Sequence, residues 1–251
     1  MTLSAYAIKE WLTILIVGLL LAVAMMLMQW WIAACLIVVA TFAVALFFRD
    51  PKRETPTQRG VVVSPVDGKI TSVHDIEHFE PFGGPAVCVR IFISLLDPHI
   101  ARSPCHGNIV SLVHTPGKHM NAMNPQSLED NEALFYALEH PIRQYPVAAV
   151  RLVAGLFART ILCPIEVGQT VQRGQKVGII KLGSAAELYL PQSLRPSITL
   201  QQGQHVLAGE TVIASVSAHD PSVRTTPAPA PGSESIEDEA MMDETFDSEP
   251  A

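Results

Sequence analysis

The distribution of hydrophobic and polar positions separates a long apolar segment from the rest of the chain. Between Trp11 and Phe48 no side chain is charged, and roughly 20 apolar residues are enough to span a bilayer. As one straight helix at about 1.5 Å per residue the segment would measure roughly 57 Å, against a hydrocarbon thickness of about 30 Å. The pattern therefore predicts a membrane anchor over residues 1–50, formed by one or two transmembrane helices, of which two shorter helices in a hairpin fit the length better.

Polar and basic residues around the apolar segment predict its turn and its orientation. Gln29 lies near its centre, beside two tryptophans, and this combination is typical of a hairpin tip at the membrane interface. Lys9 precedes the segment, and three basic residues follow it between positions 49 and 53. By the positive-inside rule both ends face the cytoplasm. We therefore expect the protein in the cell membrane, with its soluble part on the cytoplasmic side.

A different pattern begins after the anchor, over residues 51–217. Short β-branched and apolar runs are interrupted by Gly, Pro, Asp and Asn, which indicates a mainly β domain without long helices. The expected strands are Val61–Val63, Lys69–His74, Ala86–Ser94, Asn108–His114, Ala148–Val153 and Thr211–Val216.

An internal repeat supports this interpretation. The segment Val167–Val177 recurs 35 residues later as Gln202–Val212, with its glycines and two of its valines at matching positions. Such glycines supply turns with positive φ, while alternating valines face a core. The unit resembles the hammerhead hairpin of biotinyl and lipoyl carrier domains, so we expect a glycine-rich β-sandwich.

Charge is concentrated at the C-terminus. Residues 233–249 contain eight Asp or Glu and no Lys or Arg, so without them the formal net charge of −7 becomes +1. We predict an acidic disordered tail over 218–251. The remainder has no basic stripe that would indicate nucleic-acid binding.

Cysteine and histidine spacings point away from disulfides and metals. The four cysteines show neither a disulfide framework nor a C-x-x-C spacing, and we expect them to be reduced. No His-x-His pair exists, as a zinc endopeptidase of the lysostaphin kind would require, and His74 and His78 lack the His-Glu-x-x-His arrangement. We therefore expect no metal.

The dipeptide Gly183-Ser184 follows the first repeat and by itself would be a turn. Its context changes this interpretation, because the chain resembles the short bacterial and archaeal type of phosphatidylserine decarboxylases at several separated blocks. In order these are Ser64–Gly68, Asp97-Pro98-His99-x-x-Arg102-x-Pro104, Pro116–Ala122, Glu129–Glu132, Ala154–Arg159 and Leu182–Ser184.

The resemblance implies a self-processing proenzyme. The Ser184 hydroxyl would attack the Gly183 carbonyl, and β-elimination and loss of ammonia would leave a pyruvoyl group at the new N-terminus. The fragments 1–183 and 184–251 would stay associated. The pyruvoyl cofactor would then form a Schiff base with phosphatidylserine, release CO₂ and yield phosphatidylethanolamine.

The resemblance also assigns roles to individual residues. Gly183 leaves room for the attack because it has no side chain. His99 is the candidate base for Ser184 and, in protonated form, the acid that returns a proton to carbon. Asp67 would orient or charge the site. Longer family members have a second His where this chain has Arg102, so either His99 or Asp67 would take over its role.

The remaining candidates concern the substrate. The planar fork of Arg102 suits a phosphate or a carboxylate. Lys118 and Asn121 lie in a turn-rich block that would hold the head group, with a solvated loop as the alternative. Ala185 departs from short members, which commonly have Arg after the serine.

Two alternative functions remain open at this stage. The head-group chemistry would also fit an archaetidylserine or related lipid decarboxylase. A non-catalytic, membrane-anchored hammerhead scaffold would have no use for the Gly183-Ser184 junction, and the modifiable Met-Lys-Met of carrier domains is missing. A homodimer is the default expectation for the assembly.

Overall fold

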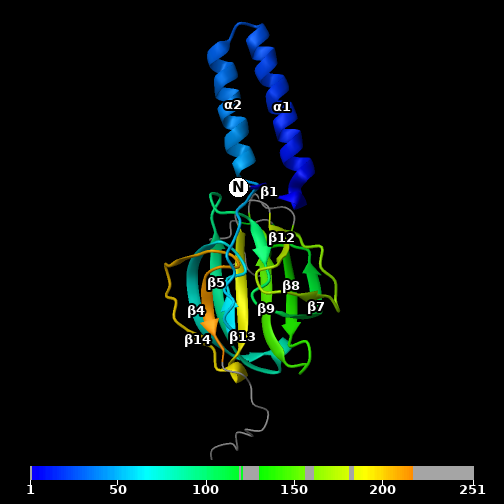
Figure 1. The fold of residues 1–251 in the computed structure, drawn as a ribbon, viewed down its shortest axis with the longest axis vertical. Helices are drawn as coiled ribbons and strands as arrows, with labels where there is room; N and C mark the ends of the chain where they lie inside the picture. Colours follow the sequence, from blue (N-terminus) through cyan, green and yellow to red (C-terminus); the bar gives the residue numbers. More distant parts are fainter. Residues whose placement is uncertain (1, 119, 121–129, 156–160, 181–183, 217–251) are drawn as a thin grey trace, which may run out of the picture. The chain divides into compact units, whose positions relative to one another are not determined.

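The computed structural model describes residues 2–118, 120, 130–155, 161–180 and 184–216 (Figure 1). Residues Met1–Ala218 form one compact unit. The predicted acidic tail, 218–251, lies outside the described residues, as do Gly183 and Asn121.

Two apolar helices form the N-terminal part of the described chain. Helices α1 (Ile8–Leu27) and α2 (Trp31–Leu46) pack along each other, and Gly18 allows the approach, since a Cβ there would lie 2.1 Å from Thr41 Oγ1. Gln29 has a φ of 61° in the turn between the helices. The predicted pair of helices is confirmed. By length and composition α1 can cross a membrane, whereas the 16 residues of α2 are fewer than a full span.

The remainder is built from antiparallel sheets (Figure 1). The large sheet contains, in spatial order, β11 (Thr170–Val171), β7 (Gly107–Thr115), β8 (Ala133–Glu139), β9 (Pro146–Val153), β13 (Ser184–Pro191), β5 (Gly84–Ile93), β4 (Gly68–Phe79) and β15 (His205–Val206). The small sheets are β10 (Ile161–Leu162), β12 (Lys176–Ile180) and β6 (Ile100–Arg102); β14 (Ser197–Ile198), β16 (Val212–Ser215) and β3 (Val61–Val63); and the pair β1 (Thr2–Leu3) and β2 (Arg49–Asp50). Short 3₁₀ turns cover Ala5–Ala7, Glu80–Phe82 and Gln192–Leu194.

The main core lies between one face of the large sheet and the two three-stranded sheets. Strand β13 contributes Ala186 and Leu188 to this core, together with Val62 of β3 and Val177 of β12. Tyr189, one position out of phase, packs on the opposite face, as the period of two requires. The predicted mainly β fold is confirmed, and each of the six expected strands overlaps an observed one.

The internal repeat also has the predicted geometry. Gly168 and Gly203 have φ values of 89° and 94°, and Gly174 and Gly209 have values of 74° and 72°. Equivalent glycines thus make equivalent left-handed turns, which side chains with a Cβ rarely adopt. Each unit sends one short strand to the large sheet and the next to a small sheet.

Candidate active site

Ser184 begins β13, a central strand of the large sheet. It pairs with Ile93 of β5, and its side chain is fully buried. Because alternate residues share a face, Ser184 points to the same side as Ala186 and Leu188, toward the main core. Its Oγ has no hydrogen-bond partner among the described residues. Ser72 and Tyr136 also have a buried hydroxyl without such a partner, so it is the combination with the Gly183-Ser184 motif block that marks this position for chemistry.

His99 lies beside the segment that leads to Ser184. It directly precedes β6, and its backbone oxygen accepts a 3.0 Å hydrogen bond from the amide of Ile180 in β12. Only three residues separate Ile180 from Ser184, so their Cα atoms, four steps apart, lie at most about 14 Å from each other. The small sheet that carries His99 covers the face toward which Ser184 points. His99 and Ser184 therefore flank the same short segment, 181–183.

The imidazole of His99 is buried next to the end of the helical hairpin. Its ring centroid lies 4.2 Å from that of Phe47, which follows α2. Burial lowers the pKa of His99 to about 4, although a hydrogen bond to the Asp97 backbone and the Asp97 charge oppose the shift. At neutral pH the ring is therefore uncharged, the form in which histidine acts as a base.

Asp67 and Ser184 lie at the same end of the large sheet, where β4 and β13 begin. Asp67 precedes β4, whose Lys69 pairs with Phe92 of β5, one residue before the partner of Ser184. The carboxylate is buried and pairs with Arg53, which also contacts Glu210 at 3.5 Å. Burial raises the pKa of Asp67 to about 6, against the lowering effect of Arg53 and a hydrogen bond from the Ala208 backbone.

The candidate substrate residues differ in their surroundings. The Arg102 guanidinium is buried, and it donates to the carbonyl oxygen of Gly174 at 3.0 Å and to Asp50 and the Pro51 carbonyl at 3.3 Å. These contacts favour a role in holding the chain after the hairpin in place. The Lys118 ammonium is exposed and lies 3.1 Å from Asp130. Substrate binding by these residues stays a prediction.

Motif blocks that are far apart in the sequence meet at this end of the large sheet. Asn131 accepts a hydrogen bond from the amide of Met120, and its side-chain amide donates to the carbonyls of Met120 and Ala154. Three of the blocks are thereby tied to one buried side chain. Ala185, next to Ser184, pairs with Val153, which places β13 beside them.

Sequence reasoning missed three residues of this region. Arg53 was assigned only to membrane orientation, but it is the partner of Asp67. Asp97 accepts hydrogen bonds from His205 and from the Ser94 amide, both at 2.9 Å. Burial would raise the pKa of Asp97, but these hydrogen bonds lower it overall. The recurrence of the repeat could have indicated His205, which replaces Thr170 of the first unit.

Cysteine and metal chemistry find little support within the described ranges. Burial raises the pKa of Cys88, Cys105 and Cys163 to about 12, so these thiols are poor nucleophiles near neutral pH. In these ranges no three His, Cys, Asp or Glu side chains gather as a metal site requires.

Known proteins share most of this chain. The sequence model of the family described as phosphatidylserine decarboxylase matches residues 41–214. The phosphatidylserine decarboxylase proenzyme of Rhodopirellula baltica is 38% identical over 207 residues, which cover 82% of this chain and 85% of that protein. The proenzymes of the same name from Nitratidesulfovibrio vulgaris and Chlorobium phaeobacteroides are each 36% identical, covering 73% and 85% of this chain and 82% and 99% of their own.

Proposed function

The chain belongs to the phosphatidylserine decarboxylase family, and from this premise we propose that it converts Ser184 into a pyruvoyl group by cutting itself after Gly183. It is a decarboxylase, a carboxy-lyase that forms phosphatidylethanolamine from phosphatidylserine. The observation that carries the proposal is the buried hydroxyl of Ser184, which has no partner among the described residues and points toward the sheet bearing His99.

Self-processing requires a nucleophile and a base. The Ser184 Oγ attacks the Gly183 carbonyl carbon, the amide bond to the Ser184 nitrogen breaks, and an ester forms. Removal of the Ser184 Hα expels the Gly183 carboxylate, and hydrolysis of the resulting enamine releases ammonia. Neutral His99 is the base we assign to the Ser184 hydroxyl, because its lowered pKa keeps it unprotonated.

The surroundings of Ser184 fit a pyruvoyl group. Loss of the hydroxyl breaks no hydrogen bond to the described residues. When bound, this group supplies a carbonyl for the substrate amine and an electron sink while CO₂ leaves. His99 returns a proton to the carbon that loses CO₂. Since His99 is neutral near pH 7, it must take up a proton before this step.

The two fragments are expected to remain together after cleavage. Strand β13 would open the smaller fragment, yet it pairs with β5 over eight residues and with β9 over five, and all eight of its residues are buried. Removing it would expose the centre of the core. Homodimer formation remains a prediction.

Two exposed leucines suggest how the site meets its lipid. The turn from Ser94 to Asp97 leads from the strand that pairs with Ser184 toward His99, and Leu95 and Leu96 in it are 49% and 82% exposed. Arg49, directly after the apolar segment, donates to the Leu96 carbonyl. We propose that both leucines enter the bilayer surface and bring the site to the phosphatidylserine head group, with both helices in the membrane and this face on the cytoplasmic side.

Replacing Leu95 and Leu96 together by serine should raise the KM for phosphatidylserine in vesicles by about tenfold or more, because apolar area no longer enters the bilayer. Self-cleavage and turnover of a monomeric short-chain phosphatidylserine should be unchanged. Ile142→Ser is the matched control, since Ile142 is 86% exposed in another turn. Equal vesicle KM values for the double variant and this control would contradict the leucine proposal.

The pKa of Asp67 predicts a pH dependence. The carboxyl gains its charge as pH rises through about 6, whereas His99, with a pKa of about 4, is already neutral there. If ionised Asp67 orients the site, the rate of self-cleavage should increase between about pH 5 and pH 7. Asp67→Asn should lower the rate by roughly 100-fold and remove this step. Asp97→Asn is the control and should keep the rise in rate, because the pKa of Asp97 is lowered and so lies below this pH range. A rise between about pH 5 and pH 7 that persists in Asp67→Asn would refute the assignment of this pH dependence to Asp67.

The substrate itself is tested with the purified full chain in mixed micelles. Phosphatidylethanolamine and CO₂ should appear in equal amounts from phosphatidylserine. Archaetidylserine carries the same head group on an ether-linked backbone, and a higher kcat/KM for it would make it the preferred lipid. Absence of CO₂ from either lipid, with processed enzyme, would overturn the proposed function.

A further inference from the structure

A cavity lies away from Ser184, where the sheet of β3 and β16 faces the turn between β8 and β9. Its volume is about 770 Å³, within the range of about 300–1,000 Å³ that small-molecule sites occupy. Leu194, on its wall, follows the far end of β13. Seven strand steps of about 3.3 Å separate Ser184 from Pro191, so the two ends of β13 lie roughly 23 Å apart.

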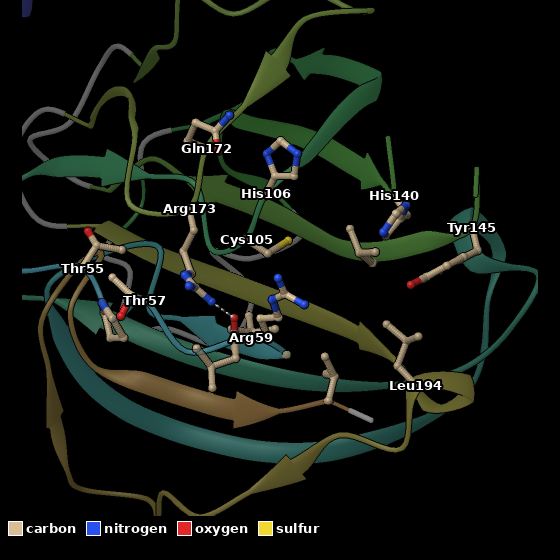
Figure 2. A pocket seen from close by; sticks show the side chains of 16 residues that line it. Thr55, Thr57, Arg59, Cys105, His106, His140, Tyr145, Gln172, Arg173 and Leu194 are labelled. Carbon is tan, nitrogen blue, oxygen red and sulfur yellow. Dashed lines mark hydrogen bonds between the residues drawn. The ribbon is translucent and has the colours of Figure 1, made fainter. Parts of the chain in front are cut away.

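The lining of this cavity is cationic. Arg59, Arg173, His106 and His140 contribute to it, and none of its described lining residues is Asp or Glu. Figure 2 shows the Arg59 and Arg173 side chains directed into the same space. Arg173 Nη1 donates to the Val61 carbonyl at 2.9 Å, while its Nε is buried without a hydrogen-bond partner in the described chain.

Other arginines of the β domain differ from this pair. Arg53, Arg90, Arg102 and Arg151 each form an ion pair with a carboxylate. Within the described ranges no such pair is found for Arg59 or Arg173. Both arginines line the same cavity without an acidic partner among the described residues, and an oxyanion bound there would pair with their charges and accept a hydrogen bond from the buried Nε of Arg173.

The two histidines add donors at the wall of the cavity (Figure 2). His140 Nδ1 accepts hydrogen bonds from the amides of Ile142 and Arg143, so its neutral ring carries its proton on Nε2 and can donate there. His106 Nδ1 lies 3.1 Å from the Val171 carbonyl and donates to it. Its Nε2 is left for a ligand, as a donor once the ring is protonated.

Thr55, Thr57 and Gln172 add polar groups to the lining, and much of the remainder is apolar. Val61, Val62, Val147 and Leu194 contribute side chains, and the ring of Tyr145 packs on His140 with centroids 5.1 Å apart. A free inorganic ion would leave this surface uncovered. The combination fits a ligand that joins a doubly charged oxyanion to a short apolar group, and a phosphate monoester has both the charge and the geometry for two guanidiniums.

We propose that this cavity is a binding site for a phosphate monoester with an apolar portion, separate from the catalytic site. The phosphate lies between Arg59 and Arg173, and the apolar portion contacts the valines and Leu194. A soluble metabolite and a lipid breakdown product share this chemistry. The site does not depend on the identity of the decarboxylation substrate.

The test is isothermal titration of the processed full chain in detergent with inorganic phosphate, phenyl phosphate and dihexanoyl phosphatidic acid. We expect saturable binding of a phosphate ester that is tighter than that of inorganic phosphate. Tightest binding of phenyl phosphate would assign a soluble source, and tightest binding of the short-chain lipid a lipid source. Absence of heat from all three, or equal affinity of esters and phosphate, would overturn the proposal.

Substitutions of individual arginines test whether the ligand binds in this cavity. Arg59→Gln and Arg173→Gln should each weaken binding by about tenfold, because each removes a charge-assisted hydrogen bond. Arg59 is exposed, so its variant should fold normally even if Arg173→Gln does not. Arg195→Gln makes the same charge change at an exposed residue outside the lining and should bind like the wild type. Unchanged affinity in Arg59→Gln, or an equal loss in Arg195→Gln, would refute the assignment.

Discussion

Replacement of Ser184 by alanine is expected to leave the chain as a single uncut polypeptide without decarboxylase activity. Alanine lacks the hydroxyl that attacks the Gly183 carbonyl, so neither the ester nor the pyruvoyl group can form. The strand itself should persist, because Ser184 makes no side-chain hydrogen bond to the described residues. Intact mass spectrometry of the purified protein distinguishes the uncut chain from a chain cut into two fragments.

The same measurement on the wild-type protein should show two fragments. Fragments should end at Gly183 and begin at residue 184, and the second should be lighter than a serine-started fragment by the mass of one ammonia. Ser111→Ala, on β7, is a control that should process normally. Cleavage of the Ser184→Ala chain at the same bond would show that another nucleophile performs the reaction.

Replacement of His99 by alanine should have the second largest effect. Loss of a positioned base typically slows a reaction by about 10²–10⁴-fold, and we expect self-cleavage to slow within this range. Any processed fraction should decarboxylate far below the wild-type rate, because His99 is also assigned the proton return to carbon. Cleavage is followed by gel after synthesis in a cell-free system, and decarboxylation by CO₂ release per mole of cut chain.

A packing defect must be separated from the loss of a base. The His99 ring contacts Phe47 near the end of the hairpin, so alanine also leaves a gap there. Phe47→Ala makes a comparable gap and leaves the imidazole in place, and it should process much faster than His99→Ala. Equal self-cleavage rates for the two variants would show that the ring contact between Phe47 and His99, rather than proton transfer by His99, controls processing. Near-normal decarboxylation by the processed His99→Ala chain would exclude His99 as the acid that protonates carbon.

Strands β8 and β13 were not among the strands expected from the sequence, for identifiable reasons. The segment Ser184–Pro191 is rich in Ala, Leu and Glu, which favour helices, and its Gly-Ser start is typical of a turn. Its Glu187 is nevertheless buried, because Arg90 and Arg151 neutralise it at 2.9 Å and 3.3 Å and Tyr189 donates to it at 2.7 Å. The two arginines come from neighbouring strands, and tertiary pairing therefore overrides local propensity.

Arg102 illustrates a second limit of sequence reasoning. Its position in a motif block and its chemistry suggested a substrate phosphate, but the folded chain surrounds it with Asp50, the Pro51 carbonyl and the Gly174 carbonyl. Which partner a guanidinium finds depends on residues brought near by folding, about 50 and 70 positions away in the chain.

By itself the sequence determined the apolar hairpin, the mainly β domain, the glycine repeat and the serine at which processing is proposed. These features depend on local periodicity, on turns that need glycine, and on motif order, all of which are written along the chain. The tertiary structure alone decided that Ser184 faces the core, that Asp67 lies at the same end of the large sheet as Ser184, and that Arg59 and Arg173 line one cavity. Sheet register and burial set these relations, because they bring together residues whose separation in sequence carries no information about their distance in space.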